Sequence, residues 1–151
     1  MTTIGPTVPP MSMSRRLLCG CYATIAAVAL LATWSQNVAY LHNPAAFLSS
    51  FLQDLKANAA SRSIMGDIAL FFLAAAIFMV LEARKHAIPY VWAYIIGGML
   101  IAISVTFPLF LIARERKLAA TDLVGPRVVD VVGLAAVATV VAAGVIFTDL
   151  A

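Results

Sequence analysis

The residues of this chain that could do chemistry are a few ionisable side chains set in long apolar stretches. Asp67 lies near the start of the stretch SIMGDIALFFLAAAIFMVLEARKH (63–86), and Glu82 lies near its end. A second aspartate, Asp130, lies at the start of the last apolar stretch. An ionisable group inside a membrane span costs at least about 2.5 kcal/mol at the bilayer centre, so each of these acids requires a partner or a function.

Asp67 is the first candidate for a catalytic residue, because a carboxyl group at membrane depth could donate a proton to a hydrophobic substrate. The same residue could serve a proton relay, an ion site or a lipid-headgroup site. A carboxylate in the first turn of a helix is also stabilised by the helix dipole, typically by about 0.3–1 kcal/mol. Capping of the helix, or pairing with arginine, is therefore the favoured interpretation of Asp67 and Asp130.

The elements that hold these acids are predicted to be membrane-spanning helices. The chain has 151 residues, of which 63% are hydrophobic and 11% charged, whereas a soluble domain is about 45–50% apolar and about 25% charged. Lipid offers no partner for backbone groups, so each apolar run of about 20 residues must be helical. The sequence predicts an all-α, polytopic membrane helix bundle over residues 15–151, after a disordered tail over 1–14, with spans at about 17–40, 63–81, 88–112 and 128–148.

Three further features of the bundle are predicted from the sequence. Apolar residues recur at helical spacing after the first span, which predicts a short amphipathic helix in the membrane interface, and they are Phe47, Leu48, Phe51, Leu52 and Leu55. Only about six residues connect the second and third spans, so these must be antiparallel neighbours. Pro108 is expected to kink the third span near its far end, or to mark the point where that helix leaves the membrane.

Four straight spans would sort the polar residues onto two sides of the membrane. The starts of the second and fourth spans share one side with the ends of the first and third. The predicted polar cluster on that side contains Asp67, Asp130, Arg114, Arg116, Arg127 and Asn37, with Gln36 beside them. Glu82, Arg84 and Lys85, followed by His86, fall on the other side, where the basic residues could bind anionic lipid headgroups.

The basic residues give two opposite indications of the orientation of the bundle in the membrane. With the amino terminus inside, four basic residues would be cytoplasmic and six would be outside, which mildly opposes the positive-inside rule. Arg15 and Arg16, directly before the first span, argue for the amino terminus inside.

Signatures of known catalytic and binding sites are missing from the sequence. There is no H-E-x-x-H, no G-x-S-x-G and no phosphate-binding glycine loop, and the chain has two histidines. We therefore expect no cofactor and no metal. The net charge of +3 comes from short loops where membrane topology accounts for it, so no nucleic-acid partner is expected.

Two stretches, IFMVLEARKHAIPYVWAY and ISVTFPLFLIARERKL, are similar to a bacterial family of small membrane proteins known as domain of unknown function 2834. The resemblance covers roughly residues 15–118 and leaves the fourth span outside the shared core. It implies a compact helical membrane protein and brings no activity, cofactor or substrate with it.

Three functional hypotheses follow from these residues. The first is a non-enzymatic accessory, scaffold or lipid-interacting protein of the cell (inner or plasma) membrane, with lipids, a second copy or another membrane protein as partners. The second is a membrane-embedded enzyme that acts on an isoprenoid or lipid through Asp67. The third is a small proton-coupled transporter, which a bundle of this size could form only as a dimer or larger assembly.

Overall fold

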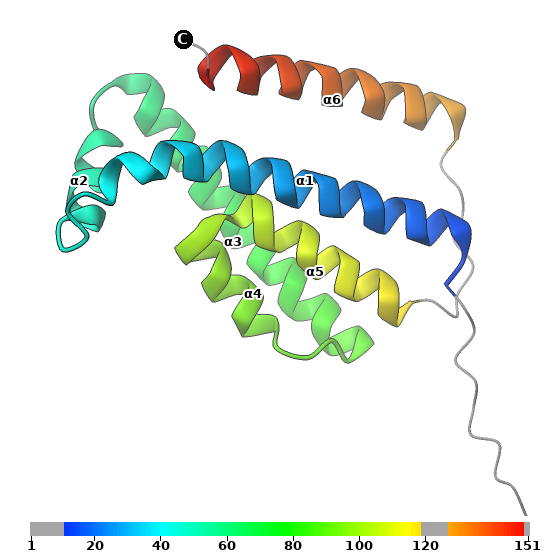
Figure 1. Ribbon diagram of the computed structural model, residues 1–151. Coiled ribbons are helices and arrows are strands. Elements are labelled where there is room, and N and C mark those ends of the chain that lie inside the picture. The colour runs from blue at the N-terminus through cyan, green and yellow to red at the C-terminus, as the bar shows by residue number, and fades with distance from the viewer. Residues whose placement is uncertain (1–10, 119–126, 150–151) are drawn as a thin grey trace, which may run out of the picture.

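A computed structural model describes residues 11–118 and 127–149 of the chain (Figure 1). The described part is helical and contains no strand. Its helices are α1 (Met13–Asn37), the 3-10 helix η1 (Val38–Tyr40), α2 (Phe47–Asp54), α3 (Ala59–His86), α4 (Val91–Gly97), the π-helix η2 (Gly98–Ala102), α5 (Ile103–Lys117) and α6 (Val128–Asp149). The first ten residues of the predicted disordered tail lie outside the described residues, and α1 already begins at Met13.

Four helical segments are long and apolar enough to cross a membrane, as the sequence predicts. Their bounds are Met13–Tyr40, Ala59–His86, Val91–Lys117 and Val128–Phe147. The predicted all-α class is thereby confirmed. The second segment starts four residues earlier than expected, because the side chain of Asn58 caps α3 by accepting a hydrogen bond from the backbone N–H of Ser61 at 2.9 Å.

The third segment does not run as one straight rod. Ala102 has an extended backbone (φ −179°, ψ 142°) between η2 and α5, and the chain reverses there. The rings of Tyr94 and Phe110 consequently lie 5.7 Å apart, whereas a continuous helix would separate residues at this spacing by about 24 Å. We name α4, η2 and α5 together the helical hairpin; in Figure 1, α4 and α5 are two separate rods joined by a sharp bend.

The break of the third segment lies at Ala102, six residues before Pro108, and Pro108 itself is buried within α5. The sequence carries a signal for the true position. Gly98 is buried at the end of α4, and a Cβ atom built on it would lie 2.9 Å from Cε2 of Phe72 and 3.0 Å from Oγ1 of Thr106. A glycine at this position therefore lets the tip of the hairpin pack closely against α3 and α5.

The hydrophobic core lies between α3 and the hairpin. Met79 of α3 and Phe110 of α5 are fully buried, and Ile95 and Ile103 complete the contact from both arms of the hairpin. α1 packs mainly along α5, where the small side chain of Ala26 is buried. The hairpin is therefore the central element, with α3 on one side and α1 on the other.

Both arms of the hairpin have their outer ends at the same end of the bundle. α4 starts directly after α3, through a turn in which Ala87 and Tyr90 adopt left-handed backbone conformations (φ 50° and 59°). α5 ends beside the start of α1 and the end of α3. We call this end, where α1 begins and α3 and α5 finish, the basal end.

The two remaining helices lie outside this core. α2 is the predicted amphipathic helix, and Phe47 and Phe51 pack with Tyr40, whose ring lies 5.9 and 5.7 Å from theirs. α6 lies beside α1 and runs in the same direction (Figure 1), with Val145 near Leu31 and Ser35. None of the described side chains of α6 is buried.

Candidate functional site

The most deeply buried charges of the described chain form an ion pair at the basal end. Arg15, in the first turn of α1, donates from Nη1 to Oε2 of Glu115 on α5. The two side chains are only 2% and 4% exposed. Ser12 caps α1, since its hydroxyl accepts a hydrogen bond from the backbone N–H of Arg15 at 3.4 Å, and this cap fixes the point at which the helix brings Arg15 inward.

The pair extends into a chain of alternating charges. Arg114 donates from Nη1 to Oε1 of Glu115 at 3.0 Å, and from Nε to Oε2 of Glu82 on α3. His86, one turn after Glu82, places Nε2 3.4 Å from the same carboxylate oxygen. We call Arg15, Glu115, Arg114, Glu82 and His86 the ion-pair network; it joins α1, α5 and α3.

Because the ion-pair network is largely buried, its charges need partners within the protein. A buried ion costs several kcal/mol unless a partner and hydrogen bonds compensate for the lost water. Both oxygens of Glu115 are engaged by arginine, and Glu82 contacts Arg114 and His86. These acids are therefore committed to structural contacts, and the charges of the two arginines and two glutamates cancel.

Asp67 lies elsewhere and is exposed on α3. It makes no hydrogen bond or ion pair with any described residue. Since α3 begins at Ala59, Asp67 is more than two turns into the helix, and the expected stabilisation by the helix dipole is lost, because that effect is confined to the first turn. Asp67 and Glu82 are separated by about 22 Å along the helix axis.

Asp130 does lie in the first turn of its helix, α6. Its Oδ2 accepts a hydrogen bond from the backbone N–H of Arg127 at 2.9 Å. This contact matches the capping interpretation of Asp130, and it comes from the backbone of Arg127 rather than from its guanidinium group.

The members of the predicted polar cluster do not lie together, because the hairpin places them at different ends of the bundle. Arg114 was expected with Asp67 but contacts Glu82, which was expected on the other side of the membrane. The reason is that the third apolar segment returns to the end from which it starts. Arg116 is exposed on α5, Asn37 ends α1 at the opposite end, and Arg84 and Lys85 are exposed at the end of α3.

Sequence reasoning missed Arg15 and Glu115 as site residues. Glu115 lies after the predicted third span, 88–112, in the charged run RERK, and such a run is typical of a solvated connection. A usable signal exists, since Glu115 follows Pro108 by seven residues, or two helical turns, and both lie on the buried stripe of α5. Arg15 gives no comparable signal, because a basic residue before a first span already has a topological explanation.

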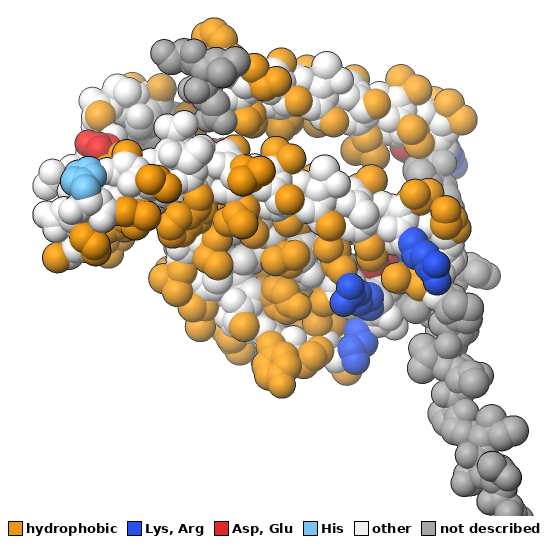
Figure 2. Space-filling model, in the orientation of Figure 1, with side chains coloured by type: hydrophobic (Ala, Val, Ile, Leu, Met, Phe, Trp, Pro, Cys, Tyr) orange, Lys and Arg blue, Asp and Glu red, His pale blue; other side chains and the backbone are white. Residues whose placement is uncertain are grey.

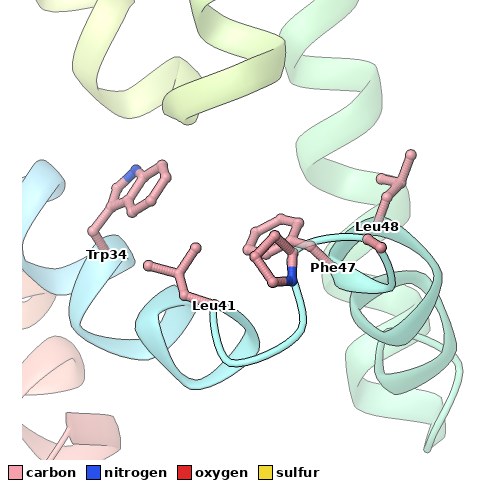
Figure 3. A pocket seen from close by; sticks show the side chains of 6 residues that line it. Trp34, Leu41, Phe47 and Leu48 are labelled. Carbon is pink, nitrogen blue, oxygen red and sulfur yellow. The ribbon is translucent and has the colours of Figure 1, made fainter.

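Two shallow apolar hollows lie towards the opposite end of the bundle from the ion-pair network, and neither contains one of the predicted acids. Figure 3 shows the first, which is lined by Trp34, Leu41, Phe47 and Leu48 from α1, α2 and the segment between them. The indole Nε1 of Trp34 is buried without a hydrogen-bond partner among the described residues. The second hollow lies between α1 and α6.

No group of three His, Cys, Asp or Glu side chains that could hold a metal occurs within residues 11–118 and 127–149.

Four apolar helical segments, with charges paired at one end of the bundle, define a multi-pass helical membrane protein. The chain belongs to the family described as protein of unknown function DUF2834, whose model matches residues 21–116. The match contains Glu82, Arg114 and Glu115 and leaves Arg15 and α6 outside. No match was found among curated proteins, and none was found among solved structures.

Proposed function

We propose that this protein is a non-enzymatic accessory or scaffold protein of the membrane. The observation that supports the proposal is the ion-pair network, in which buried acids are used to hold three helices together. Glu115 is 4% exposed and meets arginine with both oxygens. A general acid or a proton carrier would need a carboxyl group that is open to a substrate or to water, whereas both oxygens of Glu115 are engaged by arginine.

Asp67 gives the enzyme and transporter hypotheses little support. A catalytic carboxyl group is expected in a cavity together with converging polar groups. Asp67 is exposed on the surface of α3. The neighbouring Gly66 has open space around it, so this part of the helix is not packed into a site.

An accessory protein also needs surface for its partners, and the uncovered helices provide it. The described side chains of α6 are almost all exposed, and most of α3 is exposed on the side away from the hairpin. Gly133 of α6 has open space where a close helix contact could form. A second copy or another membrane protein is the proposed occupant of these faces.

Complementation of a deletion strain tests the proposal. We expect Asp67→Asn to restore growth and membrane composition as well as the wild-type chain does. We expect Glu115→Gln to fail through loss of folded protein, and the exchanged pair Arg15→Glu with Glu115→Arg to recover part of the folded protein and of the function. Loss of function in Asp67→Asn with a normal amount of folded protein would instead favour the enzyme or the transporter.

A further inference from the structure

Basic residues of the chain are concentrated at the basal end. Eight of the ten lysines and arginines lie there, and they are Arg15, Arg16, Arg84, Lys85, Arg114, Arg116, Lys117 and Arg127. Lys56 and Arg62 lie towards the other end, after α2 and in the first turn of α3. The concentration is a consequence of the hairpin, since a straight third segment would have carried the residues at 114–117 to the opposite end.

Two of the eight are neutralised within the protein, and the others are not. Arg15 and Arg114 are balanced by Glu115 and Glu82 in the ion-pair network. Arg16, Arg84, Lys85, Arg116 and Lys117 are exposed, and none of them forms an ion pair with a described residue. The remaining described acid at this end, Asp130, is engaged by the backbone N–H of Arg127.

The exposed cations surround the ends of three helices. Arg16 belongs to α1, Arg84 and Lys85 to α3, and Arg116 and Lys117 to α5. Figure 2 shows Lys and Arg side chains of this face gathered at the end where α1 begins and α5 finishes, next to apolar side chains. Long basic side chains at the ends of apolar helices reach the headgroup region of a bilayer, so we expect these residues at the level of the lipid phosphates.

We infer that the basal end is a binding surface for anionic phospholipid headgroups, formed by Arg16, Arg84, Lys85, Arg116 and Lys117. A basic residue beside an anionic membrane surface contributes about 1 kcal/mol of attraction. The buried network supports the surface by holding α1, α3 and α5 at fixed spacing, and the charges of its two arginines and two glutamates cancel. This surface goes beyond the scaffold role, which does not require any particular lipid.

The two tryptophans of the chain provide a reporter at each end of the bundle. Trp92 begins the hairpin at the basal end and is 64% exposed, whereas Trp34 lies near the end of α1 at the other end. Trp34→Phe leaves Trp92 as the single reporter, and Trp92→Phe leaves Trp34. The full chain would be reconstituted into phosphatidylcholine vesicles that contain a fixed fraction of brominated lipid, either phosphatidylglycerol or phosphatidylcholine, and fluorescence quenching would be measured.

With Trp92 as the reporter, we expect brominated phosphatidylglycerol to quench at least roughly twofold more strongly than brominated phosphatidylcholine. With Trp34, the two lipids should quench about equally. Replacing Arg84, Lys85, Arg116 and Lys117 by Gln should abolish the preference at Trp92, whereas the matched pair Lys56→Gln and Arg62→Gln should leave it unchanged.

Equal quenching of Trp92 by the two lipids would overturn the inference, as would a preference that persists in the fourfold variant. If that variant does not fold, a salt titration of the Trp34→Phe chain decides between the outcomes. Loss of the preference as salt screens the exposed cations supports the surface, and a preference that is unchanged at high salt contradicts it.

Discussion

Arg15 and Glu115 are 100 positions apart in the sequence and form an ion pair that solvent hardly reaches. The contact joins the first turn of α1 to the last turn of α5. It exists because the hairpin brings the end of α5 back to the level at which α1 begins.

Removal of one partner of this pair should strongly destabilise the bundle. In Glu115→Gln, Arg15 remains as a buried charge without its carboxylate, and we expect the free energy of unfolding to fall by about 3–5 kcal/mol. Titration with a denaturing detergent, followed by circular dichroism, measures the change. Arg116→Gln is the matched control, because Arg116 is exposed on the same turn of α5, and its effect should stay within about 0.5 kcal/mol.

Replacing both partners by apolar residues should cost less than the single changes suggest. Arg15→Met combined with Glu115→Leu leaves no buried charge at this position, and such replacements are often neutral. We expect the double variant to be more stable than Glu115→Gln alone. A double variant as unstable as the sum of its two single variants would contradict a pairwise role for these residues.

The Glu82–Arg114 pair should contribute less than the first pair. Its side chains are 15% and 27% exposed, so water compensates for part of a lost partner. We expect Glu82→Gln to lower the free energy of unfolding by roughly 1–3 kcal/mol. The same detergent titration checks this value, and the effect should be smaller than that of Glu115→Gln.

Gly98→Ala should disturb the tip of the hairpin. The added methyl group would lie 2.9 Å from the ring of Phe72 and 3.0 Å from the hydroxyl of Thr106, and such overpacking typically costs about 1–3 kcal/mol. Gly66→Ala is the matched control, because nothing lies within 4 Å of the new atom. Since alanine favours a helix over glycine by about 1 kcal/mol, Gly66→Ala should be neutral or stabilising.

Thiol labelling can test the path of the hairpin directly. In a Cys19→Ala, Cys21→Ala background, Lys85→Cys and Lys117→Cys should react with an impermeant maleimide from the same side of the membrane. Lys56→Cys should react from the other side. The excess of basic residues at the basal end favours the cytoplasm for the first pair, according to the positive-inside rule. Labelling of Lys85→Cys and Lys117→Cys from opposite sides would mean that the third segment crosses the membrane.

Much of the fold could be predicted from hydropathy, because length and apolar composition decide which segments prefer a bilayer. The four apolar segments and the amphipathic helix α2 were found in this way. Hydropathy is the same for a straight helix and for one that folds back, so the reversal at Ala102 was not predicted. The predicted site was wrong for the same reason, because a straight third span places Arg114 and Glu82 on opposite sides of the membrane.

The candidate site was predicted less well than the fold, for a physical reason. Asp67 and Asp130 stand out in the sequence because their immediate neighbours are apolar, whereas Glu115 is hidden among charged neighbours. Burial depends on which face of a helix meets another helix, and local composition does not report that face. Glu115, the most deeply buried of these acids, was therefore not predicted as a site residue.

The long separation between Arg15 and Glu115 also has a consequence for biosynthesis. α1 packs mainly on α5, so it has few neighbours until α5 has been made. At a translation rate of about 5–20 residues per second, the ribosome needs roughly 5–20 s to add the intervening residues. During this interval Arg15 of α1 cannot pair with Glu115, because Glu115 has not yet been synthesised. The helices can assemble fully only after the hairpin has been inserted into the membrane.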